Sequence, residues 1–133
     1  MENRLYYWKL ACYETSGNLP KRAIGKSNFI DLSLLPKETM REEYRRYFLY
    51  RGGQVSLNTI CHEKTYYHQV CKALQLRKNI PDSFLGWQPS KWIELLKIWM
   101  LQNGIPFYKE KETLYGTISR TDAPVLQHLK RFL

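Results

Sequence analysis

Cysteine is scarce in this chain, and the sequence motifs of the common enzyme classes are absent. Three cysteines occur among 133 residues, Cys12, Cys61 and Cys71, and an odd number with no sign of secretion argues against a disulfide framework. A glycine-rich phosphate loop, an HExxH motif, a GxSxG motif and paired zinc ligands are all missing. We therefore expect no catalytic residue, no metal and no cofactor on this chain.

The cysteines and histidines leave two weaker alternatives. Cys61, His68 and Cys71 fall along one edge of a predicted helix, but three ligands on one helix without a CxxC pair make a poor tetrahedral zinc site. A cysteine nucleophile beside a histidine base is conceivable, yet any chain with three of each offers such pairs. We expect instead that Cys71 packs in the core, with Cys61 and His68 at its border.

Long apolar runs are also missing. Lys or Glu interrupts even residues 92–101, so no stretch approaches the length of a membrane span. The first ten residues, MENRLYYWKL, are too polar for a signal peptide. Neither a basic amphipathic surface helix nor a lipid-anchor motif is evident. These features predict a cytoplasmic protein that does not bind membranes.

Positive charge is plentiful. The chain has 21 Lys and Arg residues against 12 Asp and Glu residues, a formal net charge of +9, and a calculated isoelectric point near 9.5. A Lys or Arg beside a phosphate releases condensed counterions on binding, so this excess favours a polyanionic partner, with nucleic acid first. Hydrophobic residues make up 44% of the chain, enough for the core of one compact domain.

Capping signals and apolar stripes predict the first two helices. Residues 39–50 begin with Thr39 and Glu42 in the spacing of a capping box, and Gly residues follow the segment. Residues 55–74 form a longer amphipathic segment, with Ser56 as a plausible N-cap. The two helices should therefore be separated by a short turn.

Two further helices are predicted in the second half of the chain. Residues 90–103 are apolar nearly all round and precede Gly104, so we expect this helix to be central in the core. The last helix should begin near Thr121 and Asp122, with Pro124 in its first turn. Its apolar stripe still runs at the end of the sequence without a C-cap, so we expect a longer parent protein. Between the two, residues 109–112 read as a solvated loop or helical turn.

The remaining segments suggest an arm and an ordered loop. Residues 1–33 contain two short strand-like stretches and read as an N-terminal arm, compatible with a small β-hairpin, before a helical domain at 34–133. Residues 80–89 are punctuated by Pro and Gly, and the apolar side chains Phe84, Leu85 and Trp87 should anchor them. The expected fold is mainly α, an orthogonal bundle of four to five helices with this arm.

The segment 55–74 is the best clue to function. At about 100° per residue, one side of the helix is core-like and carries Ile60, Glu63, Tyr67, Val70, Cys71 and Leu74. The opposite side is polar and carries Asn58, His62, Thr65, Gln69 and Lys72. Asn and Gln can pair with adenine, Thr can touch a thymine methyl, and Lys can reach guanine or phosphate. The simpler interpretation of such a side is a solvated helix face.

The order of segments resembles the N-terminal core-binding (SAM-like) domain of tyrosine recombinases of the phage integrase family. The resemblance runs from about Asp31 to the end of the chain and is carried by loose patterns: DLSLLP at 31–36, REEY at 41–44, SLNTI at 56–60, a Trp-rich third helix and LQHLKRFL at 126–133. The N-terminal arm lies outside it.

The resemblance implies a helical bundle joined to a C-terminal catalytic domain, the two closing around DNA as a clamp. It implies that the second and fourth helices face the duplex, which assigns DNA contact to Asn58, His62, Thr65, Gln69, Lys72, Arg120, Gln127, Lys130 and Arg131. The family's catalytic residues lie in the second domain, so none is placed on this chain. The implied partners are double-stranded DNA, the catalytic domain of the same parent chain and other recombinase protomers.

Two other functions remain open. The first is a helical protein-interaction module with a basic surface, whose hot spot would consist of Tyr44, Arg45, Arg46, Tyr47 and Tyr50. The second is binding of single-stranded nucleic acid by stacking on Tyr6, Tyr7 and Trp8.

Overall fold

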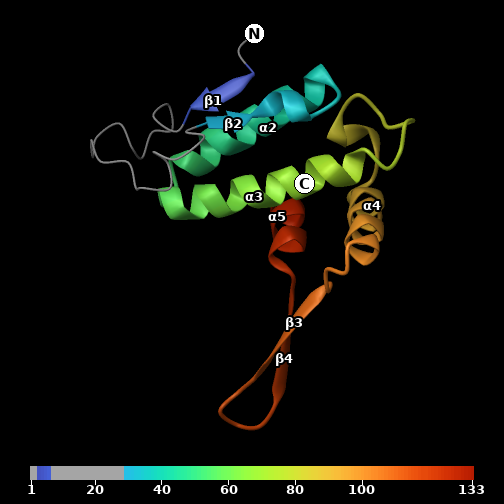
Figure 1. Cartoon of the computed structure of the whole chain (residues 1–133). Helices are drawn as coiled ribbons and strands as arrows, with labels where there is room; N and C mark the ends of the chain where they lie inside the picture. Colours follow the sequence, from blue (N-terminus) through green and yellow to red (C-terminus); the bar gives the residue numbers. More distant parts are fainter. Residues whose placement is uncertain (1–2, 7–28) are drawn as a thin grey trace.

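The computed structural model describes residues 3–6 and 29–133 and is mainly helical, as predicted (Figure 1). Four α-helices occur in this part of the chain: α2 (Glu38–Gly52), α3 (Leu57–Leu74), α4 (Pro89–Gln102) and α5 (Pro124–Phe132). Two antiparallel strand pairs accompany them: β1 (Arg4–Tyr6) with β2 (Phe29–Asp31), and β3 (Tyr108–Glu112) with β4 (Ile118–Asp122). No helix in the described ranges is long and apolar enough to span a membrane.

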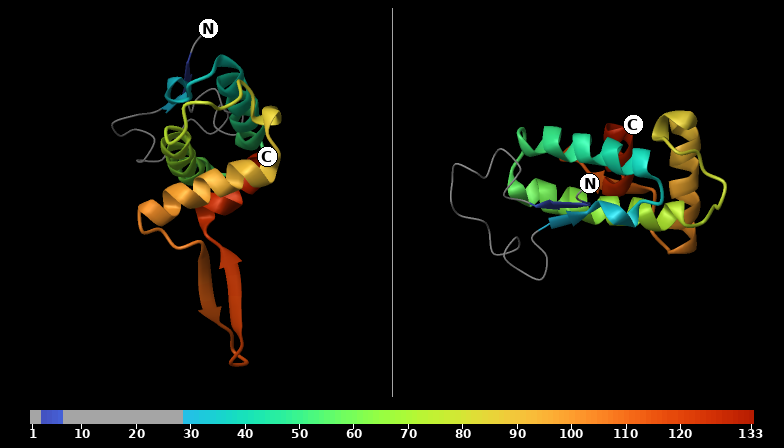
Figure 2. Two further views of the ribbon diagram at one scale, coloured as in Figure 1. Left: turned by 90° about the vertical axis from the view of Figure 1, so that its right-hand side faces the viewer. Right: turned by 90° about the horizontal axis from the view of Figure 1, so that it is seen from above.

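Helix α3 is the centre of the bundle. It packs against α2, α4 and α5, and α4 runs across the pair formed by α2 and α3 (Figure 2). The prediction that the third helix is central was wrong, since Ile93 of α4 is only half-buried and Leu101 is exposed. An apolar composition all round a helix did not decide its place, because α4 buries only part of its apolar surface and leaves Leu101 in solvent.

The helix ends are partly as predicted. The Ser56 hydroxyl accepts a hydrogen bond from the Thr59 N–H at 3.3 Å, which confirms the N-cap of α3. Gly104 follows the end of α4 with a φ of +68°, a conformation that favours glycine. The predicted capping box at Thr39 was wrong. The N-cap of α2 is Lys37, with φ −117° and ψ 139°, and its side chain makes no hydrogen bond to the helix N-terminus. Thr39 therefore already lies inside the first helical turn.

The first strand pair confirms the predicted N-terminal hairpin. Leu5 of β1 lies opposite Ile30 of β2, and both side chains are buried in the core of the helical bundle. The Tyr67 hydroxyl of α3 donates a hydrogen bond to the Asp31 carbonyl at 2.6 Å and ties β2 to the central helix. Of the three aromatic residues proposed for stacking, Tyr6 packs against Phe29, whereas Tyr7 and Trp8 lie outside the described residues, as does the rest of the arm to residue 28.

The second strand pair, β3–β4, was not predicted. Residues 109–112 belong to β3 rather than to a loop or helical turn, and Thr121 and Asp122 end β4, so α5 begins only at Pro124. The prediction failed because both faces of this hairpin are exposed to solvent. A strand with no buried face has no alternation of apolar and polar residues that would identify it.

The loop between α3 and α4 is anchored by two of its three predicted aromatic and apolar residues. Phe84 is buried, and its carbonyl accepts a hydrogen bond from the Trp92 indole N–H at 2.8 Å. Trp87 packs on Trp92 with ring centroids 4.4 Å apart. The prediction for Leu85 was wrong, because its side chain is 90% exposed. The chain turns back over itself here, and a Cβ at Gly86 would lie 2.4 Å from the Pro81 Cβ.

Gly86→Ala should therefore destabilise the fold by about 1–3 kcal/mol, since the rigid Pro81 ring cannot yield without moving the loop that anchors Trp92. The control is Gly53→Ala, whose new methyl group would come no closer than 3.7 Å to a neighbouring atom. Urea denaturation of both variants measures the difference. Equal stabilities for the two variants would contradict the close contact at Gly86.

Candidate nucleic-acid interface

The polar side of α3 faces solvent along the whole helix. Asn58, His62, Thr65 and Lys72 are exposed and Gln69 is half-exposed, whereas Ile60, Glu63, Tyr67, Val70, Cys71 and Leu74 are buried. The predicted helix phase is therefore confirmed. The row from Asn58 to Lys72 is about 21 Å long at the usual helical rise, and long enough to contact several nucleotides of a groove.

This surface is electropositive toward the C-terminal half of α3. Burial lowers the pKa of His68, and the positive charges of Lys64 and Lys72 lower it further. Lys72 has no ion-pair partner among the described residues, so its charge is available to a ligand. The Thr65 hydroxyl donates to the Cys61 carbonyl at 3.2 Å. Thr65 is therefore oriented by its own helix.

The α5 residues predicted to bind DNA are exposed, and each is held by a neighbour. The Gln127 Nε2 donates to the Asp122 carbonyl at 2.7 Å, and the Lys130 Nζ contacts the Asp122 carboxylate at 2.5 Å. Arg131 forms an ion pair with Glu63 of α3. These contacts orient the three side chains, and the two ion pairs neutralise part of the charge of Lys130 and Arg131.

One depression joins the two helices. His62, Gln127 and Arg131 line it, and its volume is about 240 Å³. Five further lining residues were not predicted as DNA contacts: Arg51, Thr59, Glu63, Tyr66 and Pro124. Thr59 and Tyr66 lie three positions before and four positions after His62, so helical spacing could have identified them. Arg51 comes from α2 and could not have been found without the tertiary fold. Asn58, Thr65, Gln69 and Lys72 lie outside the depression on the same helix.

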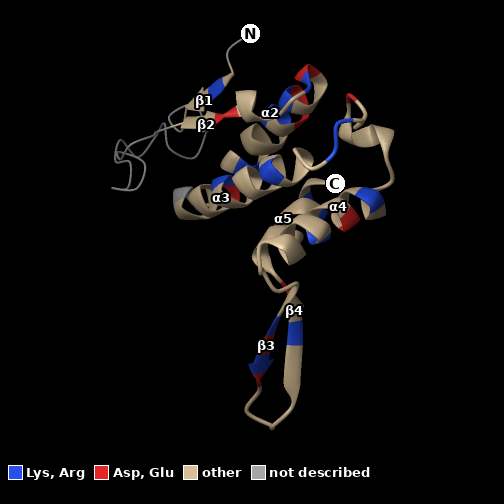
Figure 3. Ribbon diagram, turned by 45° about the vertical axis from the view of Figure 1, so that its right-hand side comes forward, with Lys and Arg blue, Asp and Glu red and all other residues tan. Residues whose placement is uncertain are grey.

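The structure places Arg120 apart from this surface. It lies on β4, where its guanidinium is 3.9 Å from the Glu110 carboxylate and 4.1 Å from the centre of the Tyr108 ring. Basic residues are therefore found both on α3 and on the hairpin (Figure 3).

A buried carboxylate lies directly beneath the depression. Glu63 is 2% exposed; one of its oxygens is 2.9 Å from the His128 Nδ1, and the same oxygen accepts a hydrogen bond from the Tyr47 hydroxyl. Its other oxygen pairs with Arg131 and lies 3.9 Å from an Arg51 nitrogen. These five side chains come from α2, α3 and α5. Glu63 therefore connects three helices at one point.

The hydrogen-bond partners keep Glu63 ionised. Burial alone would raise the pKa of this carboxyl, but the hydrogen bonds of His128 and Tyr47 and the charges of His128 and Arg131 lower it below the ordinary value of 4.5. Burial and the neighbouring Glu63 charge raise the pKa of the Tyr47 hydroxyl far above its usual range. Tyr47 therefore keeps its proton and donates a hydrogen bond to Glu63.

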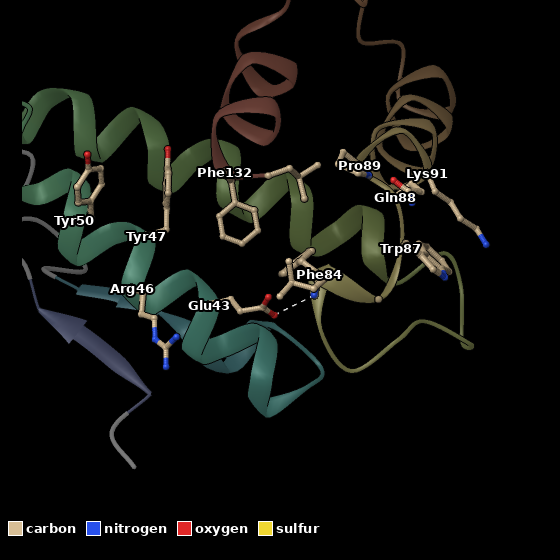
Figure 4. A pocket seen from close by; sticks show the side chains of 13 residues that line it. Glu43, Arg46, Tyr47, Tyr50, Phe84, Trp87, Gln88, Pro89, Lys91 and Phe132 are labelled. Carbon is tan, nitrogen blue, oxygen red and sulfur yellow. Dashed lines mark hydrogen bonds between the residues drawn. The ribbon is translucent and has the colours of Figure 1, made fainter.

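A larger groove lies on another part of the surface, with a volume of about 880 Å³ (Figure 4). Arg46, Tyr47 and Tyr50 of α2 line one part of it, and the loop residues Leu85 and Trp87 line another. Tyr44, predicted as part of an interaction hot spot, is fully buried and cannot contribute to it. Arg45 does not line the groove either. Three of the five proposed hot-spot residues, Arg46, Tyr47 and Tyr50, therefore line it.

Residues 3–6 and 29–133 contain no cluster of three or more His, Cys, Asp or Glu side chains that could hold a metal ion. Cys71 is buried, and burial raises the pKa of its thiol to about 12. Cys61 is half-buried on α3.

Glu63→Gln should destabilise the protein by about 3 kcal/mol at neutral pH, because it removes the carboxylate that pairs with Arg131 and binds the buried His128 side chain and the Tyr47 hydroxyl. Because folding lowers the Glu63 pKa, its contribution is present above pH 4.5 and is lost as the pH falls through the folded-state pKa. Urea denaturation from pH 7 to pH 3 should therefore show a smaller acid loss in the variant than in the native protein. Glu94→Gln, at an exposed position of α4, is the control and should change little. Equal acid losses in all three proteins would contradict this role for Glu63.

No protein-family model, no curated protein and no solved structure matches this chain. The exposed side of α3 and the adjacent α5 carry amide, imidazole, hydroxyl and basic side chains.

Proposed function

We propose that this chain is a duplex-DNA-binding domain that contacts DNA through the exposed side of α3 and the adjacent α5. The observation that carries the proposal is the row of groove-reading residue types on α3: four of the five are exposed and Gln69 is half-exposed, while the opposite side of the helix is buried. A row of amide, imidazole, hydroxyl and ammonium groups offers the donors and acceptors that base edges require.

The charge of the surface supports a phosphate partner. Lys72 carries a positive charge that no described acidic residue neutralises. Arg51 adds a second cation to the lining of the depression, with one of its nitrogens 3.9 Å from the Glu63 carboxylate. Most of the binding free energy would come from phosphate contacts, and the α3 side chains would contribute sequence preference.

The resemblance to a recombinase core-binding domain makes the proposal more specific. The second and fourth long helices of that domain would face the duplex, and in this protein the corresponding helices, α3 and α5, pack directly against each other. Under this proposal the parent protein carries a catalytic domain that breaks and rejoins DNA strands, and this domain supplies one half of a clamp. Other recombinase protomers would be its further partners.

A protein-interaction module is the second candidate, favoured by the groove beside α2. Tyr50 is 66% exposed and Leu85 is 90% exposed, and both line this groove together with Arg46 and Trp87. Exposed aromatic, apolar and Arg side chains are typical of binding hot spots. This candidate places the contact on α2 and the loop before α4 rather than on α3 and α5.

Lys72→Ala should weaken duplex binding and reduce the slope of log affinity against log salt by about 1, because one phosphate contact is lost. Its thermal stability should stay close to native, since the side chain is exposed and has no described ion pair. The matched control is Arg46→Ala, which removes the same charge from the groove beside α2 and should leave binding nearly unchanged. Fluorescence anisotropy over a salt series measures all three proteins.

The two candidates predict opposite results. Native affinity that does not fall with salt would contradict phosphate-dominated binding. A larger loss of duplex affinity with Arg46→Ala than with Lys72→Ala would place the DNA contact on the groove beside α2 and contradict the proposed surface. Chemical-shift changes along α3 and α5 on titration with duplex DNA would support the proposed surface, whereas changes confined to α2 would contradict it.

A further inference from the structure

The β3–β4 hairpin projects away from the helical body, between α4 and α5 and on the side opposite to α2 (Figures 1 and 2). All ten strand residues are exposed except Asp122, which is half-buried at the base. Five residue pairs make the hairpin about 17 Å long before its turn, at the usual strand rise. None of this length contributes to the hydrophobic core, so core packing gives no reason for it.

The two faces of the hairpin carry different charges. Lys109 lies opposite Thr121, and Lys111 lies opposite Ser119, so one face has two ammonium groups and two hydroxyl groups and no carboxylate. The other face carries Tyr108, Glu110, Glu112, Ile118, Arg120 and Asp122, and its Arg120 pairs with Glu110. Neither lysine has an ion-pair partner in the described ranges. The first face, here called the lysine face, therefore complements a polyanion.

The base of the hairpin is fixed to the body beside α5. The Ala123 N–H donates to the Phe107 carbonyl at 2.8 Å, and Phe107 packs against the core. Asp122, the last residue of β4, binds both Gln127 and Lys130 of α5. The hairpin is thus anchored at the same α5 residues that form part of the proposed DNA surface.

The turn holds apolar side chains in solvent. Gly116 has a φ of +77°, and the Thr113 N–H donates to the Thr117 carbonyl at 2.7 Å, which closes the turn. Leu114 and Tyr115, between these residues, are essentially fully exposed, at 103% and 93%. Adjacent exposed apolar side chains at the tip of a projecting element indicate a surface that a partner covers.

From the segregated charge and the apolar tip, we propose that the β3–β4 hairpin is a second DNA contact, in which the lysine face binds backbone phosphates and the Leu114–Tyr115 tip enters the adjacent minor groove. The inference rests on the proposed DNA-binding function and extends it to a site outside α3 and α5. Apolar wedges at the ends of projecting segments are a known way of engaging the minor groove, with flanking cations on the phosphates. The hairpin lengthens the contact along the duplex.

The lysine face is tested by the double variant Lys109→Ala/Lys111→Ala. It should bind duplex DNA more weakly and reduce the salt slope by about 2, one for each lost phosphate contact. The control is Arg46→Ala/Lys91→Ala, which removes the same charge; Lys91 lies in the first turn of α4, at the end away from the hairpin. The control should retain the native salt slope.

The tip is tested by Leu114→Ser/Tyr115→Ser. This variant should bind several-fold more weakly with an unchanged salt slope, because apolar contacts release no counterions. A DNA footprint shortened at one end is expected in both hairpin variants. Melting temperatures near native are expected as well, since the substituted side chains are exposed.

The outcomes separate this inference from the proposed function. If the native protein binds duplex DNA and Lys72→Ala weakens it, while the hairpin variants match the control, the hairpin inference is wrong and the function stands. If the native protein shows no salt-dependent binding, both are wrong. If the tip variant instead changes the oligomeric state in sedimentation and leaves DNA affinity native, the tip binds a second copy of the chain, and the inference is overturned.

Discussion

The ionised carboxylate of Glu63 is the interaction on which the arrangement of the helices depends. A charge this deeply buried is costly unless hydrogen bonds and opposite charges compensate it. Here the compensation comes from Tyr47 on α2 and from His128 and Arg131 on α5, so it exists only when the three helices are correctly placed. His128 extends the network, because its Nε2 lies 3.0 Å from the Tyr44 hydroxyl in the core. Apolar packing alone could tolerate small shifts of α5 along α3, but this network cannot.

This constraint determines the shape of the proposed DNA surface. Because Arg131 and His128 both bind Glu63, the exposed side of α5 is held beside the first half of α3, and His62, Gln127 and Arg131 share one depression. Asp122 then ties the hairpin to the same helix through Gln127 and Lys130. The buried network, the α3–α5 surface and the hairpin are therefore linked by a short series of contacts. A change at Glu63 would be expected to reach the surface through α5.

The sequence predicts the local features well and the long-range ones poorly. The phase of α3 and its Ser56 cap follow from helical spacing and side-chain chemistry within a few residues, and both are confirmed. Glu63 was correctly placed on the buried side, but nothing in the sequence identifies its partners, which lie 65 and 68 residues away in His128 and Arg131. The β3–β4 hairpin was missed because residues 109–112 alternate Lys and Glu and neither face of the hairpin is buried, so no alternation of apolar and polar residues marks the strands. The predicted DNA contacts themselves stay predictions.

Arg131 illustrates how the buried network and DNA binding would compete. Its guanidinium already neutralises Glu63, so a phosphate contact would either share that guanidinium or draw it away from a buried carboxylate, which is costly. Arg51 lies 3.9 Å from the same carboxylate and could compensate part of the loss. The net gain from Arg131 should still be smaller than from a cation without an internal partner. The strongest phosphate contacts are therefore expected from Lys72 on α3 and from Lys109 and Lys111 on the hairpin, on either side of α5. On this argument α5 mainly sets the spacing between two cationic surfaces, and α3 and the hairpin supply most of the charge.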